Sequence, residues 1–334
     1  MGLLSRIFRT GGNSADTDAA PRRRQPIAGE LPWRADASVP IVDWPAAHRQ
    51  MPSGADADDY WWSVALGWLD ALRIRLGPQY AIEQSDSFAM LSSLQGRTLQ
   101  LAMACCERYR RRILRDLDGI ATAWGRGPHV VLIFDALDEY YDYVGNYYPQ
   151  QGEFAMSSGM FIHHGYGHFV FQASEMAAME PVIAHELTHC LLAMLPIPAW
   201  LNEGTAVNME QALAPRSVDP RRGIFSHRET AQKRTAFWNA ETIQQFWSGK
   251  SFKRPDEGCS LSYELATEMT LLIAKDPQRY RAFMNSAHWK DAGQDAATQT
   301  LGYALEDVAA AVLGDGPWRP EPAKWIEGTE LGQF

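Results

Sequence analysis

Hydrophobic residues recur at helical spacing over much of the chain, with one marked exception near its middle. Residues 56–77 begin with acidic side chains and then place apolar residues such as Trp61, Trp68 and Leu72 at helical intervals. Residues 97–124 repeat this pattern with a charged outer face. In contrast, residues 129–135 form a short continuous apolar run, HVVLIFD, which is typical of a buried strand. The pattern predicts two helices followed by a strand.

The next part of the chain predicts a strand pair and then helices. Residues 157–172 read as two short strands around a turn at 165–167. Residues 175–195 are apolar with helical spacing, and Pro181 would be tolerated in the first turn of a helix that starts near Glu180. The segment 195–198, LPIP, should end that helix, and further helices follow. Because strands precede helices in blocks, we expect an α+β fold rather than a doubly wound sheet.

The same pattern divides the chain into five segments. These are a disordered segment at 1–40, a helical region at 41–126, a core at 127–212, a helical subdomain at 213–318 and an irregular tail at 319–334.

Composition and charge exclude several classes of protein. Hydrophobic residues make up 46% of the 334 positions and charged residues 21%, which is ordinary globular usage. The net charge of -9 argues against nucleic acid as the main partner, since phosphate binding needs a basic surface. A basic run at 21–25, PRRRQ, is read as a solvated tail.

Cysteine usage and the lack of long apolar runs indicate in which compartment of the cell the protein is expected. The four cysteines form no CxxC pair and no disulfide framework, so we expect them to be small buried apolar groups in a reducing compartment. No run is long enough for a transmembrane segment, and the N-terminal apolar run is too short for a signal peptide. The sequence therefore predicts a cytoplasmic protein.

One stretch, residues 184–206, carries most of the chemical information: AHELTHCLLAMLPIPAWLNEGTAV. His185 and His189 are four apart on a predicted helix, so both rings can reach one metal ion. Glu186 lies about 100° round the helix from His185, too far to ligate comfortably but close enough to touch a metal-bound water. Zinc wants a third protein ligand and an open fourth position, and Glu203 is the leading candidate for the third ligand.

The competing interpretation is an ordinary helical core that happens to contain these side chains. Burying two unliganded histidines and a glutamate in an apolar helix would be costly, because their desolvation would not be offset. A second glutamate also follows at a suitable distance, so we favour the metal site, with one Zn²⁺ per chain.

The motif HELTH followed by PAWLNEG resembles the gluzincin metallopeptidases, most of all the peptidase-MA-like branch with its W-L-x-E-G segment after a short loop. The resemblance covers about residues 127–314. It implies a zincin-like catalytic domain with a small mixed sheet before the zinc-binding helix and a mainly helical C-terminal part.

The resemblance also implies roles for particular residues. His185, His189 and Glu203 would ligate zinc, and Glu186 would be the general base that hydrolyses a peptide or protein substrate with metal-activated water. The SYELA segment occupies the place of a tyrosine that steadies the oxyanion, which nominates Tyr263, although it could equally be a half-buried aromatic of a helix. Either of the two short strands could align an extended peptide.

Alternatives remain at the level of function. A catalytically inactive binding or regulatory module with the same fold is the rival interpretation, and a hydrolase of non-peptide amides or esters is a third. Substrate, exo- or endopeptidase mode and oligomeric state are left open.

Several nearby polar residues have their own interpretations. The three histidines at 163, 164 and 168 lie in a predicted strand or turn; they could line the cleft, but a surface turn is the favoured interpretation. Asn202 would either support the ligand Glu203 or cap a helix, and Thr188 should face the protein rather than the metal.

Overall fold

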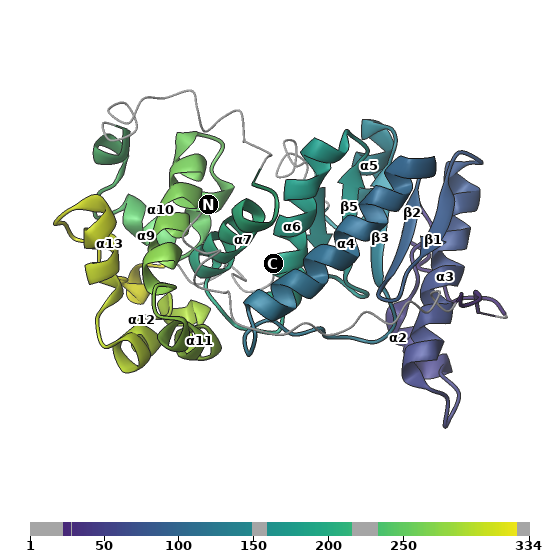
Figure 1. Cartoon of the computed structure of the whole chain (residues 1–334), viewed down its shortest axis with the longest axis horizontal. Coiled ribbons are helices and arrows are strands. Elements are labelled where there is room, and N and C mark those ends of the chain that lie inside the picture. Colours follow the sequence, from purple (N-terminus) through teal and green to yellow (C-terminus); the bar gives the residue numbers. More distant parts are fainter. Residues whose placement is uncertain (1–22, 28, 149–158, 216–232, 326–334) are drawn as a thin grey trace. The chain divides into compact units, whose positions relative to one another are not determined.

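The computed structural model describes residues 23–27, 29–148, 159–215 and 233–325, and its elements are labelled in Figure 1. The chain divides into two compact units. The first, called here the sheet unit, runs to Arg111 and then from Ala123 to Cys190. The second, the helical unit, contains residues 112–122 and the chain from Leu191 onwards. Each unit is described in turn.

The sheet unit holds all five strands and the helices between them. In chain order its elements are α2 (Trp44–Gln50), α3 (Ala57–Leu76), β1 (Ala81–Gln84), β2 (Phe88–Ser92), most of α4 (Gly96–Asp116), β3 (His129–Phe134), α5 (Leu137–Val144), β4 (Gly159–Ile162), β5 (His168–Gln172) and most of α6 (Met176–Leu192).

The strands form one mixed sheet in the order β1-β2-β3-β5-β4. The central pairs are parallel, with Leu91 opposite Leu132 and Leu132 opposite Val170, whereas β1 and β4 run antiparallel to their neighbours. Among the described strands, β4 therefore lies at the edge of the sheet and β5 lies inside it. The chain is α+β, with this sheet followed by a mostly helical C-terminal part, and the predicted fold class is confirmed.

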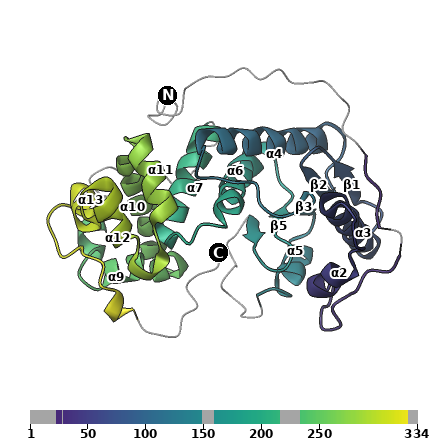
Figure 2. The ribbon, with the colours of Figure 1, turned by 90° about the horizontal axis from the view of Figure 1, so that it is seen from below.

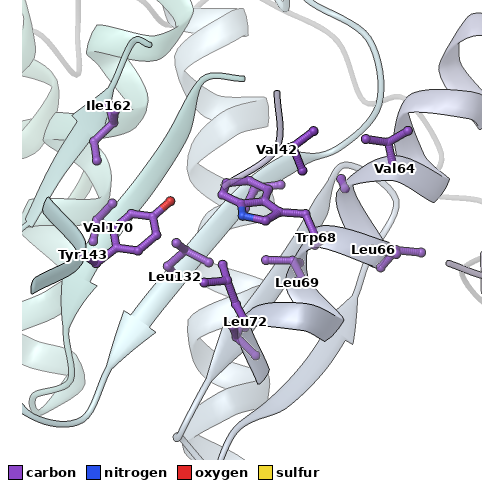
Figure 3. Close-up of a cluster of buried hydrophobic side chains, with 14 of the residues drawn as sticks. Val42, Val64, Leu66, Trp68, Leu69, Leu72, Leu132, Tyr143, Ile162 and Val170 are labelled. Carbon is purple, nitrogen blue, oxygen red and sulfur yellow. The ribbon is translucent and has the colours of Figure 1, made fainter. Parts of the chain in front are cut away.

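Helices cover both faces of the sheet. Figure 2 shows α3 and α5 on one face and α4 and α6 on the other. On the first face Trp68 and Leu72 of α3 point toward Leu132 of β3 (Figure 3), within a core that also includes Tyr143 and Val170. The period-two alternation of the strands thus gives each helix layer its own apolar surface.

The sequence analysis did not predict two of the strands. The segments Ala81–Gln84 and Phe88–Ser92 form β1 and β2, where the sequence analysis expected only helices. The five residues of β2 are all buried, so the strand shows no alternation and is too short to stand out from a helical fragment.

Helix α4 is shorter than predicted. It ends at Asp116 rather than near residue 124, and Gly119 follows in the left-handed region at φ 72°. A right-handed helix cannot continue through that conformation.

The helical unit carries further helices besides a helical stretch at 233–237. They are α7 (Ala199–Leu213), α9 (Thr242–Trp247), α10 (Glu257–Ile273), α11 (Pro277–Ser286), α12 (Gln294–Ala296) and α13 (Leu305–Leu313), with short turns η2 (Lys250–Lys253), η3 (Trp289–Asp291), η4 (Ala297–Leu301) and η5 (Pro322–Lys324). Asp256 caps α10 and Asp276 caps α11 through side-chain bonds to backbone N–H groups.

Two further predictions were a disordered segment at 1–40 and the lack of a transmembrane segment. Of the expected disordered segment 1–40, residues 1–22 and 28 lie outside the described residues, while Trp33 forms a bridge with Val42. Among the described residues no helix is both long and apolar enough to span a membrane.

Candidate metal centre

Helix α6 carries the HELTH segment and begins earlier than the sequence suggested. It starts at Met176, so Pro181 lies inside it rather than in a first turn near Glu180. The N–H groups of Ala178 and Met179 already bond the carbonyl of Glu175, which shows that a helical turn is complete before the proline. Pro181 removes a single donor from a helix that is already formed.

The two histidines of α6 converge at their outer nitrogens. The Nε2 atoms of His185 and His189 lie 3.0 Å apart, and the ring planes are inclined at 78°. As predicted from the four-residue spacing, both rings lie on the same face of the helix. Thr188 turns away, donating from Oγ1 to the carbonyl of Ala184 at 2.8 Å, and is fully buried, as predicted.

Glu203 completes a group of three ligand atoms. One nitrogen of His185, one of His189 and a carboxylate oxygen of Glu203 all lie within 4.8 Å of one another. Glu203 is 6% exposed and sits in α7, which the short connection 193–198 joins to α6. Asn202 does not cap that helix, since α7 begins at Ala199 after Pro198, so this alternative for Asn202 is wrong.

The glycine after Glu203 has a packing role within the helical unit. A Cβ at Gly204 would lie 2.3 Å from Oγ1 of Thr270 and 2.4 Å from the carbonyl oxygen of Ala266, both in α10. Only glycine allows α7 and α10 to approach this closely. Asn208, one turn further along α7, donates to the carbonyl of Thr267 at 3.1 Å, which adds a polar link between the same two helices. In the segment WLNEG, Glu203 is therefore a buried carboxylate, and Gly204 next to it lies where α7 crosses α10.

The predicted Tyr263 lies on α10, half-buried, with its ring 5.2 Å from that of Phe252 in an edge-on contact. One turn before it, burial and then the charge of Glu203 raise the pKa of the Cys259 thiol. Residues 259 and 263 are one turn apart and share a face of α10.

Glu186 is held by the edge of the sheet. Its Oε2 accepts a hydrogen bond of 2.7 Å from the backbone N–H of Phe161 in β4. That N–H points away from β5, since it is committed to a side chain outside the sheet. The charge of Glu186 also adds to burial in raising the pKa of Tyr148, which places a phenol near the carboxylate.

The donor set fits zinc. Two imidazole nitrogens and one carboxylate oxygen are ligands that zinc accepts, and three protein ligands with space for a fourth is the arrangement of catalytic sites. A single hydrogen can bridge the facing Nε2 atoms of His185 and His189, whereas one cation would use the lone pairs of both. The group is thus able to hold a metal ion.

The three histidines of the β4–β5 hairpin take no part in this group. His164 is exposed and His163 is partly exposed, but His168 is fully buried in β5, so a surface turn was the wrong environment for it. Its Nε2 lies 2.7 Å from the hydroxyl of Tyr143 and its Nδ1 2.7 Å from the carbonyl of Tyr166. Burial lowers the pKa of His168 to about 4.

Two features of the centre were not foreseen from the sequence. These are the N–H of Phe161, which binds Glu186, and the close helix crossing at Gly204. A backbone donor leaves no trace in side-chain chemistry, whereas the glycine directly after Glu203 was visible in the sequence and could have indicated a close approach.

No protein-family model matches the chain, and no curated protein matches it either.

Proposed function

We propose that the protein is a zinc-dependent metallopeptidase. The observation that carries this proposal is the group His185, His189 and Glu203, whose ligand atoms lie within 4.8 Å of one another. In α6, Glu186 directly follows His185, and its carboxylate accepts a hydrogen bond from the backbone of the edge strand β4. A structural zinc site normally has four protein ligands, and three favour a catalytic role.

The roles of the residues follow from their chemistry. His185, His189 and Glu203 would hold the ion, which when bound acidifies a water and polarises the scissile carbonyl. The Glu186 carboxylate would take a proton from the attacking water and deliver it to the leaving amine. The hydrogen bond from the Phe161 N–H to Oε2 holds the Glu186 carboxylate and would orient it for this role.

The edge strand β4 supports a peptide as the substrate. An extended peptide adds to a sheet edge through main-chain hydrogen bonds, and β4 is an edge strand that touches Glu186 directly. Of the two strands considered from the sequence, β4 is therefore the one we assign to substrate alignment. The carbonyl of Phe161 leaves β4 on the same side as its N–H and would accept from a peptide there.

Tyr263 is proposed as the donor that stabilises the oxyanion. Its place on the α10 face that also carries Cys259, whose thiol senses Glu203, supports this role. A phenol is a suitable donor to developing negative charge, and removing such a donor typically reduces turnover by about 10²–10³.

The experiment is to compare wild-type protein with Glu186→Gln after loading both with one equivalent of zinc. A peptide library cleaved by the wild type should be cleaved about 10²–10⁴ times more slowly by the variant, while the zinc content of both stays the same. Glu180→Gln is the matched control, because Glu180 lies on the same helix and its carboxylate pairs with Arg108 instead.

Two results would count against the proposal. Cleavage by Glu186→Gln at the wild-type rate would remove Glu186 from the reaction. Zinc binding with no cleavage of any peptide by the wild type would indicate the binding or regulatory module instead.

A further inference from the structure

The sheet unit contains a cavity whose wall includes none of the three candidate metal ligands. A cavity of about 410 Å³ opens beside the first residues of β3 and the loop 123–128. Its volume falls in the range of small-molecule sites, about 300–1,000 Å³. Much of its wall is aromatic: Trp44, Trp61, Trp62, Trp124 and Tyr166 line it.

The aromatic wall is a built arrangement that depends on glycines. A Cβ at Gly165 would lie 2.1 Å from Cδ1 of Trp44, and a Cβ at Gly167 would lie 2.9 Å from the ring of Phe161. Gly165 also adopts φ 66°, which disfavours other residues. The loop between β4 and β5 therefore uses glycine to let these rings reach the cavity.

Arg110 is a lining cation for which the described residues show no ion pair. Arg110 lines the cavity, and its Nε is buried without a hydrogen-bond partner. Its neighbours along α4 behave differently: Arg108 pairs with Glu180, and Arg112 pairs with Asp116 at 2.7 Å. For Arg110 the described residues provide no such carboxylate. A buried guanidinium donor without a partner is expensive, since its desolvation is not offset.

The charge of Arg110 acts on the interior of the cavity. Burial, together with the Arg110 charge, lowers the pKa of His129 to about 3, so this lining imidazole is neutral near pH 7. This effect locates the guanidinium close to His129, beside the cavity.

The other polar atoms of the wall also favour an acceptor as ligand. The indole Nε1 of Trp44 is a second buried donor for which the described part of the chain offers no partner. The carboxylate of Asp58 is already engaged, because its Oδ1 accepts from the N–H of Gly127 at 2.8 Å. Asp86, the other lining carboxylate, is exposed.

We propose that this cavity binds a small aromatic carboxylate, whose carboxylate pairs with the Arg110 guanidinium and whose ring contacts the tryptophans. Arginine suits the planar carboxylate because its fork of N–H groups can donate two parallel hydrogen bonds. The proposal does not require bound zinc, because none of the three candidate metal ligands lines the cavity.

The test is isothermal titration calorimetry of the full chain, without added metal, using three probes of similar shape. These are cinnamate, cinnamamide and cinnamylamine, which carry a negative, a neutral and a positive head group. We expect saturable binding of cinnamate with a Kd below about 1 mM, and binding of the other two at least about 10-fold weaker.

Variants assign the binding to Arg110. Arg110→Gln should weaken cinnamate binding about 10-fold or more, because it removes the charged donor. Arg111→Gln is the matched control: Arg111 is the next residue of α4, is exposed and lies outside the wall, so its affinity should equal that of the wild type. Arg110→Lys keeps the charge but not the fork, and should fall between the two.

The wild-type probes keep the proposal testable even if Arg110→Gln fails to fold. No saturable binding of cinnamate at about 5 mM, or equal binding of cinnamamide, overturns the proposal. Tighter binding of cinnamylamine overturns it as well, since it would assign the site to a cation. Unchanged affinity in a folded Arg110→Gln protein has the same consequence.

Discussion

The histidines of α6 and the buried histidine of the β4–β5 hairpin differ in what surrounds their nitrogens. His168 uses both ring nitrogens on protein groups, the hydroxyl of Tyr143 and the carbonyl of Tyr166, and burial lowers its pKa to about 4. His185 and His189 instead turn their Nε2 atoms toward each other at 3.0 Å, with a Glu203 oxygen within 4.8 Å of both.

This difference separates a structural histidine from two candidate ligand histidines. His168 is satisfied by two neighbours of fixed position, so it needs no ion. The α6 pair brings basic nitrogens and a carboxylate together, an arrangement that a cation stabilises and that apolar packing alone would not. Histidine content alone does not indicate a metal site, whereas convergent ring nitrogens beside a carboxylate indicate a group that could hold an ion.

The largest expected effect is on metal content. His189→Ala should reduce zinc from about one per chain to none after dialysis, because only two ligands remain. His164→Ala, in the exposed part of the hairpin, should keep the wild-type content. Elemental analysis of the dialysed proteins checks this. Equal zinc content in both variants would contradict the view that the α6 histidines bind zinc and the hairpin histidines do not.

A smaller but measurable effect is expected for the third ligand. Structural zinc sites bind with about 10–16 kcal/mol, so one of four ligands contributes on the order of 3 kcal/mol, or more than 100-fold in affinity. Glu203→Gln should lower the zinc affinity by about this factor, measured in a competition titration with a chelator. Glu210→Gln, later in the same helix, is the control. An unchanged zinc affinity in Glu203→Gln would remove it from the ligand set.

Much of the fold could be predicted from sequence where the pattern is long or strongly apolar. The run 129–135 gave β3, the strand pair gave β4 and β5, and residues 199–213 match α7. The short strands β1 and β2 were missed, because their four and five residues carry no distinctive periodicity. Whether a strand lies at the edge depends on pairing partners far away in the chain, so the place of β4 could not be read locally.

The candidate centre was predictable to the extent that its chemistry is local. His185 and His189 are brought together by the helix itself, which fixes residues four apart on one face. The environment of His168 was not predictable, because Tyr143 comes from a separate helix and reaches it only through the tertiary fold. The same holds for the bond from Phe161 to Glu186.

The comparison can be sharpened with pH. His168 has a folded pKa of about 4 against about 6.5 in an unfolded chain, so the unfolded state binds the proton more readily. Its contribution to stability is complete above about pH 6.5 and is lost as the pH falls toward 4, by at most about 3 kcal/mol. His168→Gln should therefore flatten the fall in unfolding free energy between these pH values, measured by urea titration. His164→Gln should leave the curve unchanged, and parallel curves for both variants would mean that His168 is not a buried neutral imidazole.

The smallest effect tests the packing that surrounds Glu203 rather than a ligand. Gly204→Ala would put a Cβ within 2.4 Å of the backbone oxygen of Ala266 and should lower the unfolding free energy by about 2 kcal/mol. Gly67→Ala is the matched control, since it is also in a helix and its nearest neighbour, at 3.1 Å, is the flexible end of Leu31. There the usual gain of alanine over glycine in a helix, up to about 1 kcal/mol, offsets the crowding. Thermal melts of both variants give the comparison. A Gly204→Ala protein as stable as Gly67→Ala would mean that α7 and α10 can separate, and Glu203 would then not owe its position to their close crossing.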